Sequence, residues 1–100
     1  MDSARWLADQ SAGAPPALSA RAARYLAAQA DASDPALMLA SAAREALAVS
    51  LAYAGDRAAA LDLLAADALV TLALKARAVS DPAGLGAFAA ELSHMGAERR

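Results

Sequence analysis

Hydrophobic side chains recur three and four positions apart along most of the chain, and proline, glycine and aspartate divide it into segments. This spacing is typical of amphipathic helices. The helices predicted from it span residues 3–10, 16–30, 35–54, 57–79 and 82–95.

The boundaries between these segments carry helix-capping residues. Asp34-Pro35 and Asp81-Pro82 each place an N-cap carboxylate before proline at the first helical position, where the missing N–H costs nothing. Gly55 suits the left-handed end of one helix, and Asp56 suits the N-cap of the next. The short connections make consecutive helices antiparallel neighbours.

A chain of 100 residues forms one domain. We therefore expect residues 1–100 to form a small all-α, up-and-down bundle with four main helices and a short N-terminal helix. Composition favours this class, because 34 alanines and 15 leucines accompany only three valines and no isoleucine. So much alanine predicts a thin core in which the helices approach closely.

Charge and cysteine content exclude several functions. The net charge is −2, and the nine basic residues are not clustered, which argues against binding to nucleic acid. The absence of cysteine excludes disulfides, thiolate metal sites and thiol catalysis. No signal-peptide pattern and no apolar run of about 20 residues is present. We expect a cytoplasmic protein without membrane insertion, and the arginine- and alanine-rich composition suggests a bacterial source.

The helix predicted over 57–79 has two apolar faces. One broad stripe consists of Leu61, Leu64, Ala65, Ala68, Leu72, Ala76 and Val79. A second, nearly opposite stripe consists of Leu63, Val70 and Leu74, with Asp67 at its edge. Such a helix is either the buried centre of the domain or the carrier of a partner surface.

The second stripe predicts a homodimer interface formed by Leu63, Asp67, Val70 and Leu74. One bundle does not easily cover two opposed stripes, and a twofold partner would cover the exposed one. The alternative is a monomer in which the N-terminal helix, with Trp6 and Leu7, lies on this stripe. Asp67 would pair with a basic side chain of another helix or chain, or reach water at the rim.

Glu91 and His94 are the strongest candidates for metal ligands. The Glu-x-x-His spacing occurs in di-iron bundles, with Glu98 and Glu45 as further donors here. A second Glu-x-x-His pair is missing, and the simpler interpretation is a solvated histidine at the negative end of a helix dipole. We expect no bound metal and no cofactor.

The remaining polar residues do not suggest catalysis. Asp62 and Asp67 lie about 140° apart around their helix and so share no face. Ser93 and His94 are adjacent and point in different directions. We expect a non-catalytic interaction module or small accessory subunit that binds itself, or alternatively a larger protein. Another hypothesis is a bundle that binds a small ligand or metal in the gaps that alanines leave between helices.

One short segment resembles a known enzyme family. Residues 64–73, Leu-Ala-Ala-Asp-Ala-Leu-Val-Thr-Leu-Ala, are similar to a helix of the trans-prenyltransferases. That resemblance implies an all-α fold, dimerisation and diphosphate binding through Mg²⁺. The DDxxD motifs that hold the metal in that family are missing, so no catalytic residue is transferred and the resemblance implies at most a degenerate relative.

Overall fold

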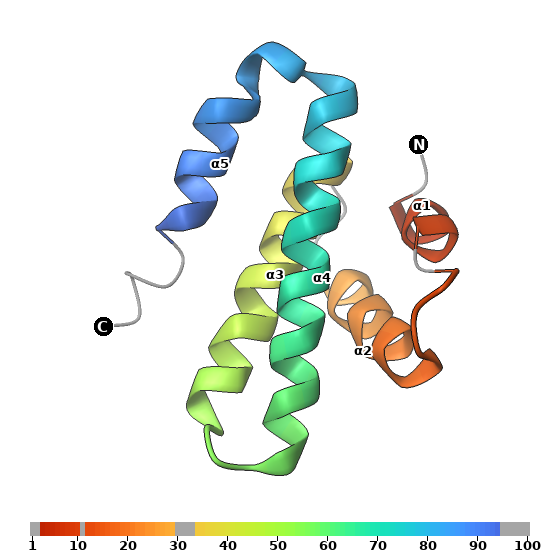
Figure 1. The fold of residues 1–100 in the computed structure, drawn as a ribbon, viewed down its shortest axis with the longest axis vertical. Coiled ribbons are helices and arrows are strands. Elements are labelled where there is room, and N and C mark those ends of the chain that lie inside the picture. The colour runs from red at the N-terminus through yellow and green to blue at the C-terminus, as the bar shows by residue number, and fades with distance from the viewer. Residues whose placement is uncertain (1–2, 11, 30–33, 95–100) are drawn as a thin grey trace.

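The computed structural model describes residues 3–10, 12–29 and 34–94, and it confirms the predicted small all-α bundle (Figure 1). The helices begin and end within about one turn of the predicted limits. They are α1 (Ser3–Gln10), α2 (Pro16–Ala27), α3 (Pro35–Ala52), α4 (Arg57–Ser80), the 3₁₀ turn η1 (Pro82–Gly84) and α5 (Leu85–Ser93).

The predicted caps are present. Asp34 accepts a hydrogen bond from the backbone N–H of Ala36, and Asp56 accepts one from Ala58, both at 3.0 Å. Asp81 caps η1 by accepting from the backbone N–H of Gly84 at 3.1 Å. Gly55 has a φ of 97°, the left-handed conformation expected between α3 and α4.

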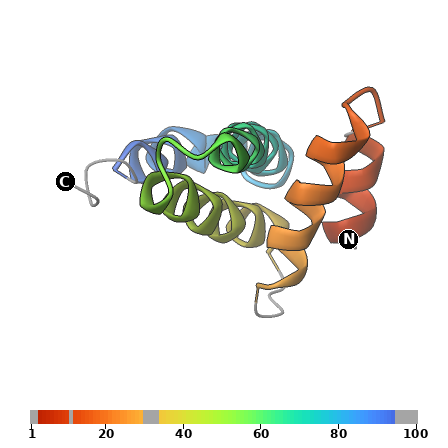
Figure 2. The ribbon, with the colours of Figure 1, turned by 90° about the horizontal axis from the view of Figure 1, so that it is seen from below.

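The antiparallel pair α3 and α4 forms the centre of the molecule. After η1 the chain reverses, and α5 runs antiparallel to α4 along one side (Figure 1). On the other side α2 crosses the α3–α4 hairpin steeply, and α1 lies beside α2 (Figure 2). The helices α3, α4 and α5 thus run up and down, whereas α2 lies across them.

The core is thin, as the composition predicts. Its largest fully buried side chains are Leu39 on α3 and Leu69 on α4, and most of the other buried positions are alanines. The small side chains let the backbones of α3 and α4 approach closely. By length and apolar composition α3 could cross a membrane, but a core helix of a soluble protein meets the same criteria.

The broad stripe predicted on α4 coincides only in part with the face that the helix buries. Leu64 and Val79 are 55% and 77% exposed, whereas Leu69, which neither stripe included, is fully buried. The buried face is centred between the two predicted stripes and shares Ala65, Leu72 and Ala76 with the first of them. It consists of Ala59, Asp62, Ala65, Ala66, Leu69, Leu72, Ala73 and Ala76. The stripes were chosen by the positions of the leucines. Most of the buried face consists of alanines instead, because their small side chains allow close packing.

The N-terminal helix docks on the side opposite to α5. Leu7 is buried in the core and Trp6 packs against it, while α1 as a whole packs mainly on α2 and α3. The second stripe of α4 faces the side of the hairpin on which α5 packs. Arg77 contacts Phe88 of α5, and Arg77 lies only about 20° around α4 from Val70, a member of that stripe. The structure therefore does not show α1 covering the second stripe, which is the arrangement that the sequence analysis gave as the alternative to a dimer.

Candidate functional site

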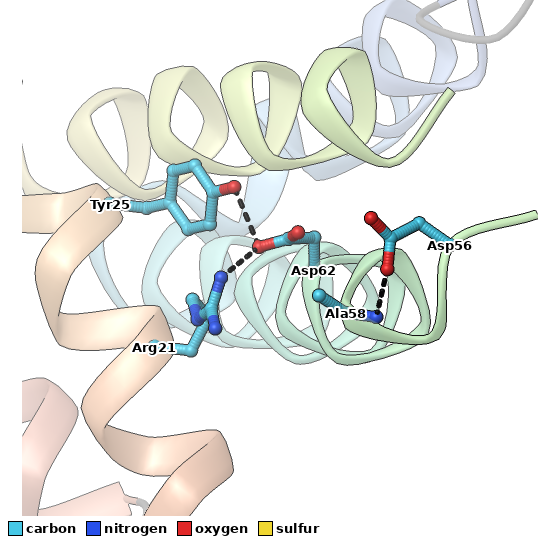
Figure 3. A network of polar contacts seen from close by, with 5 residues as sticks. All are labelled: Arg21, Tyr25, Asp56, Ala58 and Asp62. Carbon is cyan, nitrogen blue, oxygen red and sulfur yellow. Dashed lines mark hydrogen bonds and ion pairs between the residues drawn. The ribbon is translucent and has the colours of Figure 1, made fainter. Parts of the chain in front are cut away.

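One carboxylate lies inside the apolar core, where α2 crosses α4. Asp62 is 4% exposed. Its Oδ1 atom accepts hydrogen bonds from Arg21 Nη1 and from the Tyr25 hydroxyl, each at 2.8 Å (Figure 3). A buried charge is tolerated when it is paired and hydrogen-bonded. The two α2 side chains therefore make the burial of Asp62 possible.

Arg21 and Tyr25 reach the same oxygen because they lie four residues apart on α2 and project from one side of it. Burial, followed by the hydrogen bond to Asp62, raises the pKa of Tyr25 from 10.0 to about 12. Tyr25 is thus a neutral donor at neutral pH. This chemistry suits a structural tie between α2 and α4 better than a general base.

A small polar pocket opens beside this tie. It has a volume of about 200 Å³ and is lined by Arg21, Arg24, Tyr25, Ala28 and Glu45. Glu45, on α3, accepts a hydrogen bond at 2.8 Å from Gln29, which also donates to the carbonyl oxygen of Tyr25. The pocket therefore combines two guanidinium groups on α2 with one carboxylate on α3.

The candidate metal ligands do not converge in the part of the chain that the structure describes. Glu91 and His94 are exposed, and His94 is the C-cap of α5. Glu45 is engaged by Gln29, and Glu98 lies outside the described residues. Within residues 3–10, 12–29 and 34–94 there is no group of three metal-ligating side chains.

Three of the four predicted interface residues line one hollow. Leu63, Asp67 and Val70 of α4 surround it together with Ala66 and with Leu47 of α3, and its volume is about 220 Å³. The fourth residue, Leu74, is half-buried against the core. Leu63 is 53% exposed, and Val70 is half-buried.

A second hollow continues toward the loop between α3 and α4. It has a volume of about 300 Å³ and shares Leu63 with the first hollow. Its lining is mostly apolar and small, and consists of Ser50, Leu51, Ala54, Gly55, Asp56, Ala59, Ala60 and Leu63. We call the two hollows together the hairpin groove. Leu63 stands between them, and Leu51, 49% exposed, borders the lower one.

Sequence reasoning selected Asp67 and missed Asp62. Asp67 is exposed, and its side chain has no hydrogen bond or ion pair among the described residues. The available signal for Asp62 was its spacing: it precedes Ala66, Leu69 and Ala73 at intervals of three and four residues. An arginine and a tyrosine four residues apart on a neighbouring helix supply suitable partners.

We also compared the chain with known proteins. No family model, no curated protein and no solved structure matches it. The similarity of residues 64–73 to trans-prenyltransferases is accordingly not accompanied by a family match.

Proposed function

We propose that the chain is a non-catalytic helical interaction module that binds a second copy of itself through the hairpin groove. The observation that carries this proposal is the groove itself. The described chain leaves it open between α3 and α4, with Leu51 and Leu63 each about half exposed beside alanine-lined hollows. Full burial of a leucine contributes roughly 1.5–3 kcal/mol, so covering both side chains favours association.

The shape of the groove favours a second copy as the partner. It presents protruding leucines next to hollows lined by small side chains, so that one surface supplies both the ridges and the spaces that a twofold interface needs. Asp67 lines the upper hollow, and Asp56, whose carboxylate caps α4, lines the lower one. A net charge of −2 per chain also gives only weak repulsion between copies.

Two adjacent leucines provide a matched test. Leu63 and Leu64 have nearly equal exposure, 53% and 55%, but only Leu63 lines the described groove. Sedimentation should show a dimer for the wild type and for Leu64→Glu, and a folded monomer for Leu63→Glu. A wild type that remains monomeric at high micromolar concentration contradicts the proposal. Equal disruption by the two variants also contradicts it, because the groove would then have no special role.

The polar pocket beside Tyr25 favours a second candidate, a bundle that binds a small ligand. Arg21 and Arg24 on one wall and Glu45 on the other suit a small molecule with separated negative and positive groups. Native mass spectrometry of untagged protein distinguishes the two functions. A dimer of the bare chain mass supports the interaction module, whereas a retained ligand that is lost in Arg24→Ala supports the ligand-binding bundle.

A further inference from the structure

The polar pocket between α2 and α3 holds two opposite charges that lack a charged partner. Of the residues that line it, Arg21 is paired with the buried Asp62 at 2.8 Å, so that this pair is electrically neutral. Arg24 and Glu45 form no ion pair, with each other or with a third side chain, among the residues that the structure describes. The pocket therefore keeps a positive charge on α2 apart from a negative charge on α3.

Three of the lining side chains are held in place by contacts outside the pocket. Arg21 and Tyr25 both donate to one oxygen of Asp62, which is 4% exposed (Figure 3). Glu45 accepts a hydrogen bond at 2.8 Å from Gln29. The other N–H groups of the Arg21 guanidinium make no hydrogen bond within the described chain, and this side chain is 27% exposed. These groups are thus positioned before a ligand arrives, which lowers the entropic cost of binding.

We infer that the pocket binds a small amino acid. Arg24 and the free edge of Arg21 hold its carboxylate, and Glu45 holds its ammonium group. A guanidinium binds a carboxylate through paired N–H···O hydrogen bonds, and a carboxylate accepts hydrogen bonds from an ammonium group. A ligand with a single charge would leave either Arg24 or Glu45 without a partner. This inference rests on the second candidate function, the ligand-binding bundle, and does not require self-association.

The size of the pocket limits the ligand. Its volume of about 200 Å³ is below the roughly 300–1,000 Å³ of sites for drug-sized molecules. Among the described residues of the lining, Ala28 is the only aliphatic one, so little apolar surface is available for a large hydrophobic side chain. Free glycine, β-alanine and γ-aminobutyrate meet these limits, and they differ in the separation of ammonium and carboxylate.

Titration of the isotope-labelled protein with these three amino acids tests the inference by NMR. Acetate and methylammonium, at the same concentration and ionic strength, are the controls that carry one charge each. At least one amino acid should shift the amide resonances of residues 21–29 and 45. It should also bind at least about tenfold more tightly than either control, because it makes charge-assisted hydrogen bonds to both charges of the pocket.

Single substitutions separate the two ends of the site. Arg24→Gln and Glu45→Gln should each weaken binding of that amino acid at least about tenfold. Arg44→Gln and Glu91→Gln are the matched controls, because both residues are exposed and neither lines the pocket. These two variants should bind the amino acid as the wild type does.

The possible results separate this inference from the functions on which it builds. Acetate that binds as tightly as the best amino acid identifies a site for anions alone, which overturns the inference and leaves the ligand-binding bundle standing. Equal weakening by Arg44→Gln and Arg24→Gln also overturns it, because binding would then follow the overall charge and not the pocket. If none of the five compounds shifts the resonances of the pocket at millimolar concentration, the inference and the ligand-binding bundle both fail. Self-association is tested separately by sedimentation.

Discussion

At the scale of single residues, Asp62 joins α2 to the hairpin through two hydrogen bonds. Its neighbours on the buried face of α4 are mostly alanines, which pack closely but do little to select one crossing direction. A buried carboxylate that must meet Arg21 and Tyr25 together is more selective, because few placements of α2 bring both donors within hydrogen-bond distance. The polar tie thus supplies specificity that the small apolar side chains lack.

Removal of this carboxylate should destabilise the fold. Asp62→Ala leaves Arg21 and Tyr25 without their acceptor, and we expect the free energy of unfolding to fall by about 3 kcal/mol. Asp67→Ala is the control on the same helix, and it should change stability by less than about 0.5 kcal/mol because Asp67 is exposed. Urea denaturation measures both, and equal effects would show that the Asp62 contacts are not important for stability.

The same contacts should appear in the titration of Tyr25. The chain has two tyrosines, so Tyr53→Phe leaves Tyr25 as the reporter. Its ultraviolet phenolate absorbance should titrate near pH 12, because burial and Asp62 raise its pKa from 10.0. The folded state holds this proton more tightly than the unfolded state, so the associated stability is complete below pH 10 and is lost as the pH rises toward 12. A midpoint near 10 in the folded protein would contradict the contact.

Which of the two nearby aspartates is buried could not be predicted from the sequence. Both Asp62 and Asp67 lie among leucines and alanines, and an alanine-rich helix has only a weak preference for the face it buries. The choice depends on partners 37 and 41 residues away in the sequence. Local periodicity contains no information about these distant donors.

At the scale of elements, prediction was more successful because helix ends depend on neighbouring residues. Asp34 and Asp81 cap where their Asp-Pro steps predict, and Asp56 follows Gly55 as expected. The structure adds a second role for Asp34, whose Oδ2 atom accepts a hydrogen bond at 3.0 Å from Arg77 Nη2. Asp34 therefore links the start of α3 to the last turns of α4.

The two capping aspartates should differ in their effect on stability. Asp81→Ala removes one cap and should cost about 1 kcal/mol. Asp34→Ala removes a cap and also leaves the largely buried Arg77 without its carboxylate, so we expect a loss of about 2 kcal/mol. Thermal denaturation of both variants compares them. Equal melting temperatures would show that the Asp34–Arg77 pair adds nothing to capping.

The two glycines near the start of α5 provide a second comparison. A side chain at Gly84 would collide with the Asp81 carboxylate, whereas Gly86 has open space around it. Gly86→Ala should therefore stabilise the protein by about 0.5–1 kcal/mol through helix propensity. Gly84→Ala should lower stability by up to about 1 kcal/mol because it displaces the cap. Its penalty should disappear in an Asp81→Ala background, and a penalty that persists there would contradict the proposed collision.

At the scale of the whole molecule, the helix pattern predicted the fold class but not how every helix packs. Short loops correctly predicted the antiparallel pairing of α3 with α4 and of α4 with α5. The steep crossing of α2 is accompanied by its contacts with Asp62, which are long-range in the sequence. The second stripe of α4 is divided, since Leu74 packs against the core of its own chain while Leu63 borders the open groove.

Self-association through the groove should make the stability of the protein depend on its concentration. A dimer that unfolds to two monomers gains about 1.4 kcal/mol per mole of dimer for each tenfold rise in concentration, or half of that per chain. For a chain of this size the melting temperature should rise by roughly 3–5 °C per tenfold rise in concentration. Leu64→Glu should retain this dependence. Leu63→Glu should melt at one temperature throughout, because its charge would be buried in the hollow of the second copy without a partner. A constant wild-type melting temperature over a hundredfold range of concentration would mean that the leucines of the groove stay in water in the folded protein.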